Sequence, residues 1–313
     1  MATDDRTDDR IEGSPGGSPE GSSGGNPGGS HGQGWPGQGW PNPEDDGNPP
    51  PESGALRYGW FSPLGWYADL GFMLSHLTRL PAPAGSHIDF RGRLARAVRT
   101  NPLVGLIVGA IGAAAYGLAS WLGLGPLPAA TLAVLATLFA TGAYHEDGLA
   151  DTADGFGGAF ERARKLAIMS DSRHGSYGVV AIVASLLLRI AAIAAIAGPG
   201  LVFAVLVATH AGARALLPAI MLWREPAKTE GQGFEAGRPE PRAVVAALAI
   251  AVFIAVVALG FGAFVPLLAA AVGAWAMTEI ARRQIGGYTG DVLGAAEQIA
   301  EIAMLLALAA ALA

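Results

Sequence analysis

Long uninterrupted runs of apolar residues dominate the chain beyond residue 100. The first run, residues 103–122, contains 20 positions without a charged side chain. At 1.5 Å per residue, a helix of this length crosses the hydrocarbon layer of a bilayer, which is about 30 Å thick. Further runs, which are similarly apolar, cover residues 127–144, 177–197, 201–222, 243–261, 264–280 and 295–313. The pattern predicts an all-α, polytopic membrane helix bundle with about seven transmembrane helices.

The connections between these runs alternate in character. Three are short and uncharged, at residues 123–126, 198–200 and 262–266. The others are long, and together with the segment before the first run they contain fourteen Lys and Arg residues. Because basic loops stay on the cytoplasmic side, we expect the polar loops and the amino terminus inside the cell and the carboxyl terminus outside. This predicts a multi-pass protein of the cell membrane whose chemistry faces the cytoplasm.

Two segments before the first run differ from the rest. Residues 58–80 are rich in Trp and Tyr but carry Asp69 and His76, which favours a helix lying in the cytoplasmic interface over a further span. Residues 1–55 contain 14 Gly, 9 Pro and 10 acidic residues against 2 basic ones, so they cannot bury a core. We therefore expect a disordered cytoplasmic tail over residues 1–55 and a membrane-embedded catalytic domain over residues 56–313.

Composition narrows the chemistry of this membrane domain. The formal charge of −6 belongs to the tail, and a mean hydropathy of +0.37 in spite of that tail places the remainder among membrane proteins. The chain has no cysteine, which excludes disulfides, thiolate metal sites and cysteine nucleophiles. Oxygen and imidazole groups are therefore the ligands available to a metal ion.

An acidic cluster follows the second apolar run. If the helix continues, Asp147, Asp151 and Asp154 lie at positions i, i+4 and i+7, on one face. Three carboxylates repel one another, and a hard divalent cation would neutralise them. His145 and His174 lie beside the acidic clusters and could bind the cation or carry protons. The alternatives are a solvated acidic loop and hydrogen-bonded loop histidines.

Two further polar clusters lie in other loops of the predicted cytoplasmic side. Asp171 could extend the metal site, and Arg173 presents a planar pair of donors to phosphate oxygens. Ser172 and Gly175 suit a tight polar turn that faces a ligand. A simple salt bridge between the acid and the arginine is the alternative. Near the last span, Asp291 adds a carboxylate to a glycine-rich segment in which the backbone can approach a ligand closely.

The last apolar run also contains acidic residues. Glu297 and Glu301 are one helical turn apart and need partners within the bundle. The candidates are Arg189 in the third run, and His210 with Arg214 in the fourth. Ionisable groups at membrane depth suggest function, although a buried structural ion pair is the alternative for Arg189 and Glu301.

Three separated motifs, in order along the chain, resemble one enzyme family. They are TGAYHEDGLADTADGF (141–156), MSDSRHGSYGVVAI (169–182) and GGYTGDVLGAAEQIAE (286–301), with LTRLPAP (77–83) and NPLVGLIVG (101–109) upstream. They are similar to the adenosylcobinamide-GDP ribazoletransferase family, also called cobalamin (5′-phosphate) synthase. The resemblance runs from about residue 60 to the carboxyl terminus and leaves the tail unmatched.

The resemblance implies a Mg²⁺-dependent membrane phosphotransferase. It would join α-ribazole, or its 5′-phosphate, to adenosylcobinamide-GDP and release GMP, with no nucleic-acid partner. The implied metal ligands are Asp147, Asp151, Asp154, Asp171 and Asp291. The proton acceptor is one of the carboxylates or His145, so the catalytic candidates are Asp147, Asp151, Asp154 and His145. The implied substrate-binding residues are Arg79, Ser172, Arg173, Gly175, Arg214, Gly287, Thr289 and Gly290.

Two other functions are open at this point. A phosphotransferase of the CDP-alcohol type also has an aspartate cluster near the cytoplasmic face, but Asp151 stands where that pattern has Arg. A transporter could use the acids and bases within the spans, but the predicted membrane domain has no internal repeat and its acids crowd one membrane face. The number of metal ions, the phosphorylation of the ribazole and the oligomeric state, including a homo-oligomer, also stay open.

Overall fold

The computed structural model describes residues 58–82 and 90–312; the tail predicted over residues 1–55 lies outside them. Each of the seven apolar runs forms a helix within this part of the chain. These helices are α3 (Asn101–Trp121), α4 (Pro126–Thr141), α7 (Ser176–Ile196), α8 (Pro199–Trp223), α10 (Pro241–Leu259), α11 (Phe264–Ile285) and α12 (Gly290–Leu312). The shorter elements are α1 (Pro63–Leu77), α2 (Phe90–Ala97), α5 (Tyr144–Gly158), α6 (Arg162–Met169), α9 (Gln232–Glu235) and the 3-10 helices η3 (Val98–Thr100) and η4 (Gly260–Ala263). The described residues contain no strand, which confirms the predicted all-α bundle.

The number of spans differs from the prediction. Five helical runs are long and apolar enough to cross a membrane, or six if the bent pair α4 and α5 counts as one. One of the five, Pro241–Ile285, holds both α10 and α11, which η4 separates at Gly260 (φ +64°). The predicted run 127–144 extends too far, because α4 ends at Thr141 and α5 leaves at 90°. At 16 residues, α4 alone is shorter than the about 20 residues that a straight span needs.

Close helix packing surrounds α8, which contacts α3, α10 and α12. Gly105 and Gly109 of α3 lie directly against its backbone: a Cβ atom on either would stand 2.2 or 2.5 Å from a carbonyl oxygen of α8. Small residues allow such approach, and van der Waals packing of this kind stabilises helix pairs in lipid. Most of α8 is buried as a result, including His210 and Arg214.

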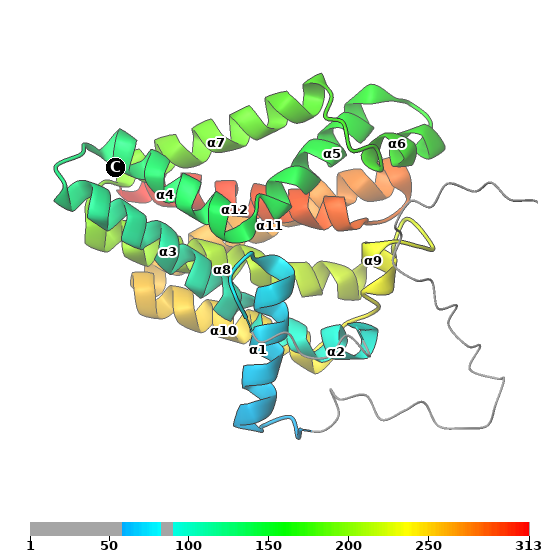
Figure 1. Ribbon diagram of the computed structural model, residues 1–313, viewed down its shortest axis with the longest axis horizontal. Helices are drawn as coiled ribbons and strands as arrows, with labels where there is room; N and C mark the ends of the chain where they lie inside the picture. Colours follow the sequence, from blue (N-terminus) through cyan, green and yellow to red (C-terminus); the bar gives the residue numbers. More distant parts are fainter. Residues whose placement is uncertain (1–57, 83–89, 313) are drawn as a thin grey trace, which may run out of the picture. The chain divides into compact units, whose positions relative to one another are not determined.

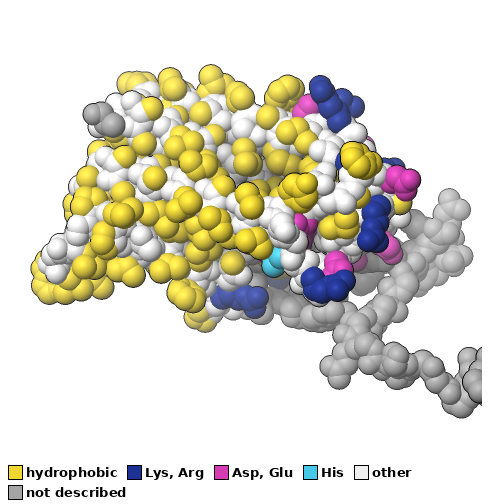
Figure 2. Space-filling model, turned by 90° about the horizontal axis from the view of Figure 1, so that it is seen from above, with side chains coloured by type: hydrophobic (Ala, Val, Ile, Leu, Met, Phe, Trp, Pro, Cys, Tyr) yellow, Lys and Arg dark blue, Asp and Glu magenta, His cyan; other side chains and the backbone are white. Residues whose placement is uncertain are grey.

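Polar segments gather at one end of the bundle. Figure 1 shows α2, α6 and α9 at the end away from the carboxyl terminus, and we call this the polar end. Figure 2 shows charged side chains mainly at one end of the visible face, with hydrophobic side chains over most of the remainder. The alternation of charged and uncharged connections therefore corresponds to the two ends of the helices.

The helix α1 occupies the segment predicted to lie at the membrane interface. Its 15 residues are too few for a span, and Figure 1 shows it running across the long helices. The structure explains why this apolar segment contains Asp69. The Asp69 carboxylate is buried between Arg96 and Arg99, whose side chains approach it to 3.0 and 2.9 Å. Arg99 also stacks on the Trp66 ring at 3.9 Å, so α1 is anchored to the bundle through these contacts.

Candidate active site at the polar end of the bundle

The acidic motif lies on a helix, as predicted. A tight bend precedes α5, where Gly142 and Ala143 both adopt positive φ (66° and 56°). This bend directs α5 away from α4 and presents Asp147 and Asp151 on successive turns. Arg79 packs against the bend. A Cβ on Gly142 would stand 2.5 Å from Arg79 Nε, and the backbone N–H of Arg79 donates to the Ala140 carbonyl oxygen.

Asp147 and Asp151 meet His174, which comes from the loop before α7. The Nε2 atom of His174 lies 3.6 Å from Asp147 Oδ1, and its Nδ1 lies 3.6 Å from Asp151 Oδ1. One ligand atom from each residue lies within 4.8 Å of the others. Two carboxylates and an imidazole at this separation fit a divalent cation. Asp147 is the most accessible, with 65% of its side chain exposed, so the cluster opens to solvent.

Asp154, the third carboxylate of the motif, has a different environment. It is buried and accepts hydrogen bonds from the backbone N–H groups of Gly175 (2.6 Å) and Gly178 (2.9 Å). These groups belong to the N-cap residue and the first turn of α7, where backbone donors lack intrahelical partners and a carboxylate is favourable. A Cβ on Gly178 would stand 2.3 Å from the Asp154 carboxylate. Asp154 and Gly175 therefore hold the His174 loop against α5.

Asp171 and Arg173 pair with each other. Arg173 donates from Nη2 and Nε to the Asp171 carboxylate at 2.8 and 3.0 Å. These hydrogen bonds lower the pKa of Asp171 from 3.8 to about 2. The Arg173 side chain is 86% exposed, and Ser172 between them is exposed as well. The structure thus forms the salt bridge that the sequence left as an alternative, and Asp171 is not one of the three residues whose ligand atoms group at Asp147.

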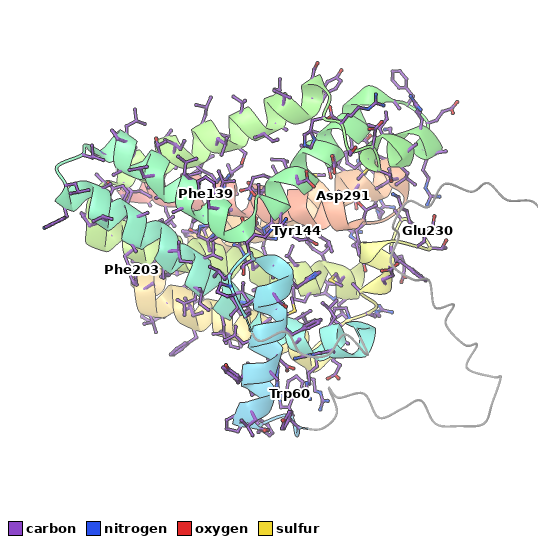
Figure 3. The ribbon with its side chains drawn as sticks, in the orientation of Figure 1. Trp60, Phe139, Tyr144, Phe203, Glu230 and Asp291 are labelled. Atoms are coloured by element: carbon purple, nitrogen blue, oxygen red, sulfur yellow. The ribbon has the colours of Figure 1, made fainter. Side chains whose placement is uncertain are left out.

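A pocket of about 320 Å³ lies between α5 and the third motif. Thr289, Gly290 and Asp291 line it together with Asp147, and Thr289 Oγ1 donates to Asp291 Oδ2 at 3.2 Å. Gly148 lets α5 approach α12, since a Cβ there would stand 2.8 Å from the Asp291 carbonyl oxygen. Figure 3 labels Tyr144, Asp291 and Glu230, which line this pocket from α5, α12 and the loop before α9.

Gly287 lies behind the pocket wall. A Cβ on it would stand 2.2 Å from the Glu225 carbonyl oxygen. Next to it, Tyr288 and Pro226 form an isolated parallel bridge, in which Tyr288 accepts from Ala227 (2.7 Å) and donates to Glu225 (3.1 Å). Gly287 therefore permits contact between two loops.

The acids of α12 have the partners that the sequence proposed. Glu297 Oε1 lies 2.7 Å from Arg214, and Glu301 lies 3.2 Å from Arg189, which also contacts Glu146 at 2.9 Å. His210 approaches Glu301, and His145 approaches Glu297. All seven side chains are buried. Arg214 and His145, each 1% exposed, are therefore enclosed in this buried charge cluster and do not line the 320 Å³ pocket.

Sequence reasoning missed several of the pocket residues. Tyr144, Lys228 and Glu230 line the pocket, and the last two come from the charged loop after α8. The sequence marked Lys228 only as one of the basic residues in the charged loops. In most membrane proteins such residues set the orientation in the membrane and do not indicate a binding site. The contribution of Lys228 to the pocket depends on the bridge between Pro226 and Tyr288, residues that are far apart in the sequence.

The fold and this pocket define a polytopic, all-helical membrane protein with an acidic site at one end of the bundle. The chain matches the family model described as cobalamin-5-phosphate synthase over residues 69–309. It belongs to that family and is a transferase of cobalamin synthesis. The resemblance seen in the three motifs is thereby confirmed, in preference to the CDP-alcohol phosphotransferase and transporter alternatives.

Curated relatives cover most of the chain. The adenosylcobinamide-GDP ribazoletransferase of Bradyrhizobium diazoefficiens is 48% identical over 244 residues, which are 78% of this chain and 94% of that protein. The proteins of the same name from Mesorhizobium japonicum and Ralstonia nicotianae are 42% and 40% identical, over 78% and 77% of this chain and 93% and 94% of their own lengths. No solved structure matches the chain.

Proposed function

We propose that this transferase moves the adenosylcobinamide phosphoryl group from adenosylcobinamide-GDP to a ribose hydroxyl of α-ribazole, or of α-ribazole 5′-phosphate, in which the 5′ oxygen is already esterified. The products are adenosylcobalamin, or its 5′-phosphate, and GMP. The observation that carries the proposal is the meeting of Asp147, Asp151 and His174 at the edge of a polar pocket, in a chain whose relatives bear this activity in their names. The basic loops at this end support a position of the site on the cytoplasmic side of the cell membrane, which is part of the proposal.

Mg²⁺ is the cation that we propose for this site. Asp147 and Asp151 would hold it through carboxylate oxygens, with His174 beside them and Asp291 across the pocket. When bound, Mg²⁺ supplies charge neutralisation for the diphosphate and for the departing GMP phosphate. Asp154 contributes by capping α7, which holds the His174 loop near the two acids.

A carboxylate of the pocket is our choice for the proton acceptor. Asp147 and Asp291 both line the space that a ribazole hydroxyl would enter, whereas His145 is enclosed in the buried charge cluster. An acceptor must come within hydrogen-bond reach of the hydroxyl that it deprotonates. Accessibility therefore favours the two aspartates over His145.

Turnover tests this function directly. Purified full-length protein in lipid nanodiscs, supplied with adenosylcobinamide-GDP, α-ribazole and Mg²⁺, should release GMP and form the joined cobalamin product. Parallel reactions with α-ribazole 5′-phosphate will identify the preferred acceptor from kcat/KM. Omission of Mg²⁺ should stop the release, and Asp147→Asn should do the same in its presence. Folded protein that releases no GMP from either acceptor would contradict the proposal.

A further inference from the structure

The proposed pocket has more acidic than basic side chains in its lining. Its lining contains the carboxylates of Asp147, Glu230 and Asp291. A diphosphate brings further negative charge, and like charges at close range repel. The arginines that the sequence suggested for phosphate binding lie elsewhere, since Arg173 pairs with Asp171 and Arg214 with Glu297.

Among the lining residues, Lys228 is the one basic side chain. It is half-buried, and its Nζ donates to Ser170 Oγ at 2.7 Å across the pocket mouth. Within the described part of the chain it forms no ion pair, in contrast to Arg173 and Arg224, which are each paired with a carboxylate. The Lys228 ammonium thus has donors left for a ligand.

The backbone before Lys228 is held on two sides. On one side, Ala227 donates its N–H to the Tyr288 carbonyl oxygen at 2.7 Å. On the other, the Ala227 carbonyl oxygen accepts from Arg162 Nη2 at 2.8 Å. A lysine stem is flexible, so fixing the preceding residue reduces the entropy lost when its ammonium is placed. Gly287 makes this arrangement possible, because any larger residue would push the Glu225 carbonyl away.

We infer that Lys228 is the residue that binds a non-bridging phosphate oxygen of the nucleoside diphosphate group, in place of Ser170. The inference rests on the proposed function and deepens it by naming the positively charged side chain that contacts the diphosphate. An ammonium binds phosphate as a point charge with three donors, and charge-assisted contacts of this kind are the strong ones. Ser170, which accepts from Lys228, keeps its own hydrogen bond to the Leu166 carbonyl oxygen at 3.0 Å when the ligand takes its place.

Binding of inorganic pyrophosphate tests the inference without turnover. Calorimetric titration of the full-length protein in nanodiscs, with Mg²⁺ present, should show a loss of about tenfold or more in affinity for Lys228→Gln. Lys228→Arg should recover most of it, and raised salt should weaken the wild type more than Lys228→Gln. The matched control is Arg164→Gln, which removes an exposed cation of α6 that does not line the pocket and should bind as the wild type does.

Chemical labelling provides a second measurement on the unaltered protein. The chain has two lysines, Lys165 and Lys228, of which Lys165 is buried beside Gln284. Pyrophosphate should protect Lys228 from an amine-specific acetylating reagent and leave the labelling of Lys165 as it was. This readout does not depend on the folding of any variant.

The outcomes separate the inference from the function. If pyrophosphate binds and protects Lys228 but the protein releases no GMP, the phosphate site is supported and the proposed reaction is contradicted. GMP release with equal pyrophosphate affinity in wild type and Lys228→Gln, or with Lys228 unprotected, would overturn the inference and leave the reaction standing. Wild-type protein that does not bind pyrophosphate would also overturn it.

Discussion

Two pairs of carboxylates, one on α12 and one on the adjoining helix α5, have opposite surroundings. In the buried charge cluster, Glu297 and Glu301 each have an arginine within 3.2 Å. At the polar end, Asp147 and Asp151 have no arginine or lysine in ion-pair contact among the described residues, and a histidine lies 3.6 Å from both. A buried carboxylate is destabilising unless the protein itself supplies a countercharge. An accessible carboxylate is solvated by water and can bind a cation from solution. The difference separates acids that hold the bundle together from acids that bind a ligand.

Replacing a pocket acid should give the largest effect on activity. Asp147→Asn or Asp151→Asn removes a charge from the proposed cation site, and we expect GMP release to fall by about 100-fold or more. The thermal stability should stay near that of the wild type, because repulsion between the two acids is relieved. GMP release and thermal melting of the same preparations will test this. Full activity in both variants would remove the metal site from the proposal.

Replacing one partner in the buried charge cluster should act mainly on stability. Arg214→Met leaves Glu297 buried without its nearest cation, at a cost of about 3–5 kcal/mol in the free energy of unfolding. The double variant Arg214→Met with Glu297→Met should recover part of that loss, because neither charge then remains uncompensated. Melting curves of the two single variants and the double variant will measure the coupling. Additive losses would mean that the two residues do not act as a pair.

A smaller effect should follow at the loop contact behind the pocket. Gly287→Ala introduces a Cβ that clashes with the Glu225 carbonyl oxygen, and overpacking of this kind costs about 1–3 kcal/mol. Because the loop carries Lys228, we expect KM for adenosylcobinamide-GDP to rise more than kcat falls. Gly117→Ala is the control, since a Cβ there meets no atom within 4 Å. Steady-state kinetics of both variants will compare the two positions, and equal KM values would contradict this role of Gly287.

The smallest effect should come from the amino-terminal tail. Its composition offers no apolar core and no arrangement of catalytic groups. Deletion of residues 1–55 should leave kcat/KM for GMP release nearly unchanged. Kinetics of the purified truncated enzyme beside the full chain will check this, and a large loss of activity would show that the tail contributes to the reaction.

Much of the arrangement was predictable because it is local. Apolar runs of about 20 residues correspond to helices long enough for a bilayer, and the spacing of Asp147, Asp151 and Asp154 places them along one helix. The predicted partners of Glu297 and Glu301 were also correct, since buried charges in a membrane helix require countercharges and few were available. The predicted run ended three residues beyond the end of α4, because the positive φ angles of Gly142 and Ala143 bend the chain there.

The remaining features depend on contacts between distant segments. Asp154 caps α7 through residues 21 and 24 positions further along, which converts a predicted metal ligand into a support for the His174 loop. Lys228 reaches the pocket only through the pairing of its loop with Tyr288, and Arg214 faces Glu297 because α8 and α12 pack together.

The amino-acid sequence by itself therefore determined the helices, the polar end and the kinds of groups available there, because hydropathy and helical periodicity act over a few turns of chain. Beyond the partners of Glu297 and Glu301, only the tertiary structure decided which charges neutralise one another and which stay accessible to a ligand. Burial and ion pairing depend on what each side chain meets across the bundle, and no local pattern carries that information.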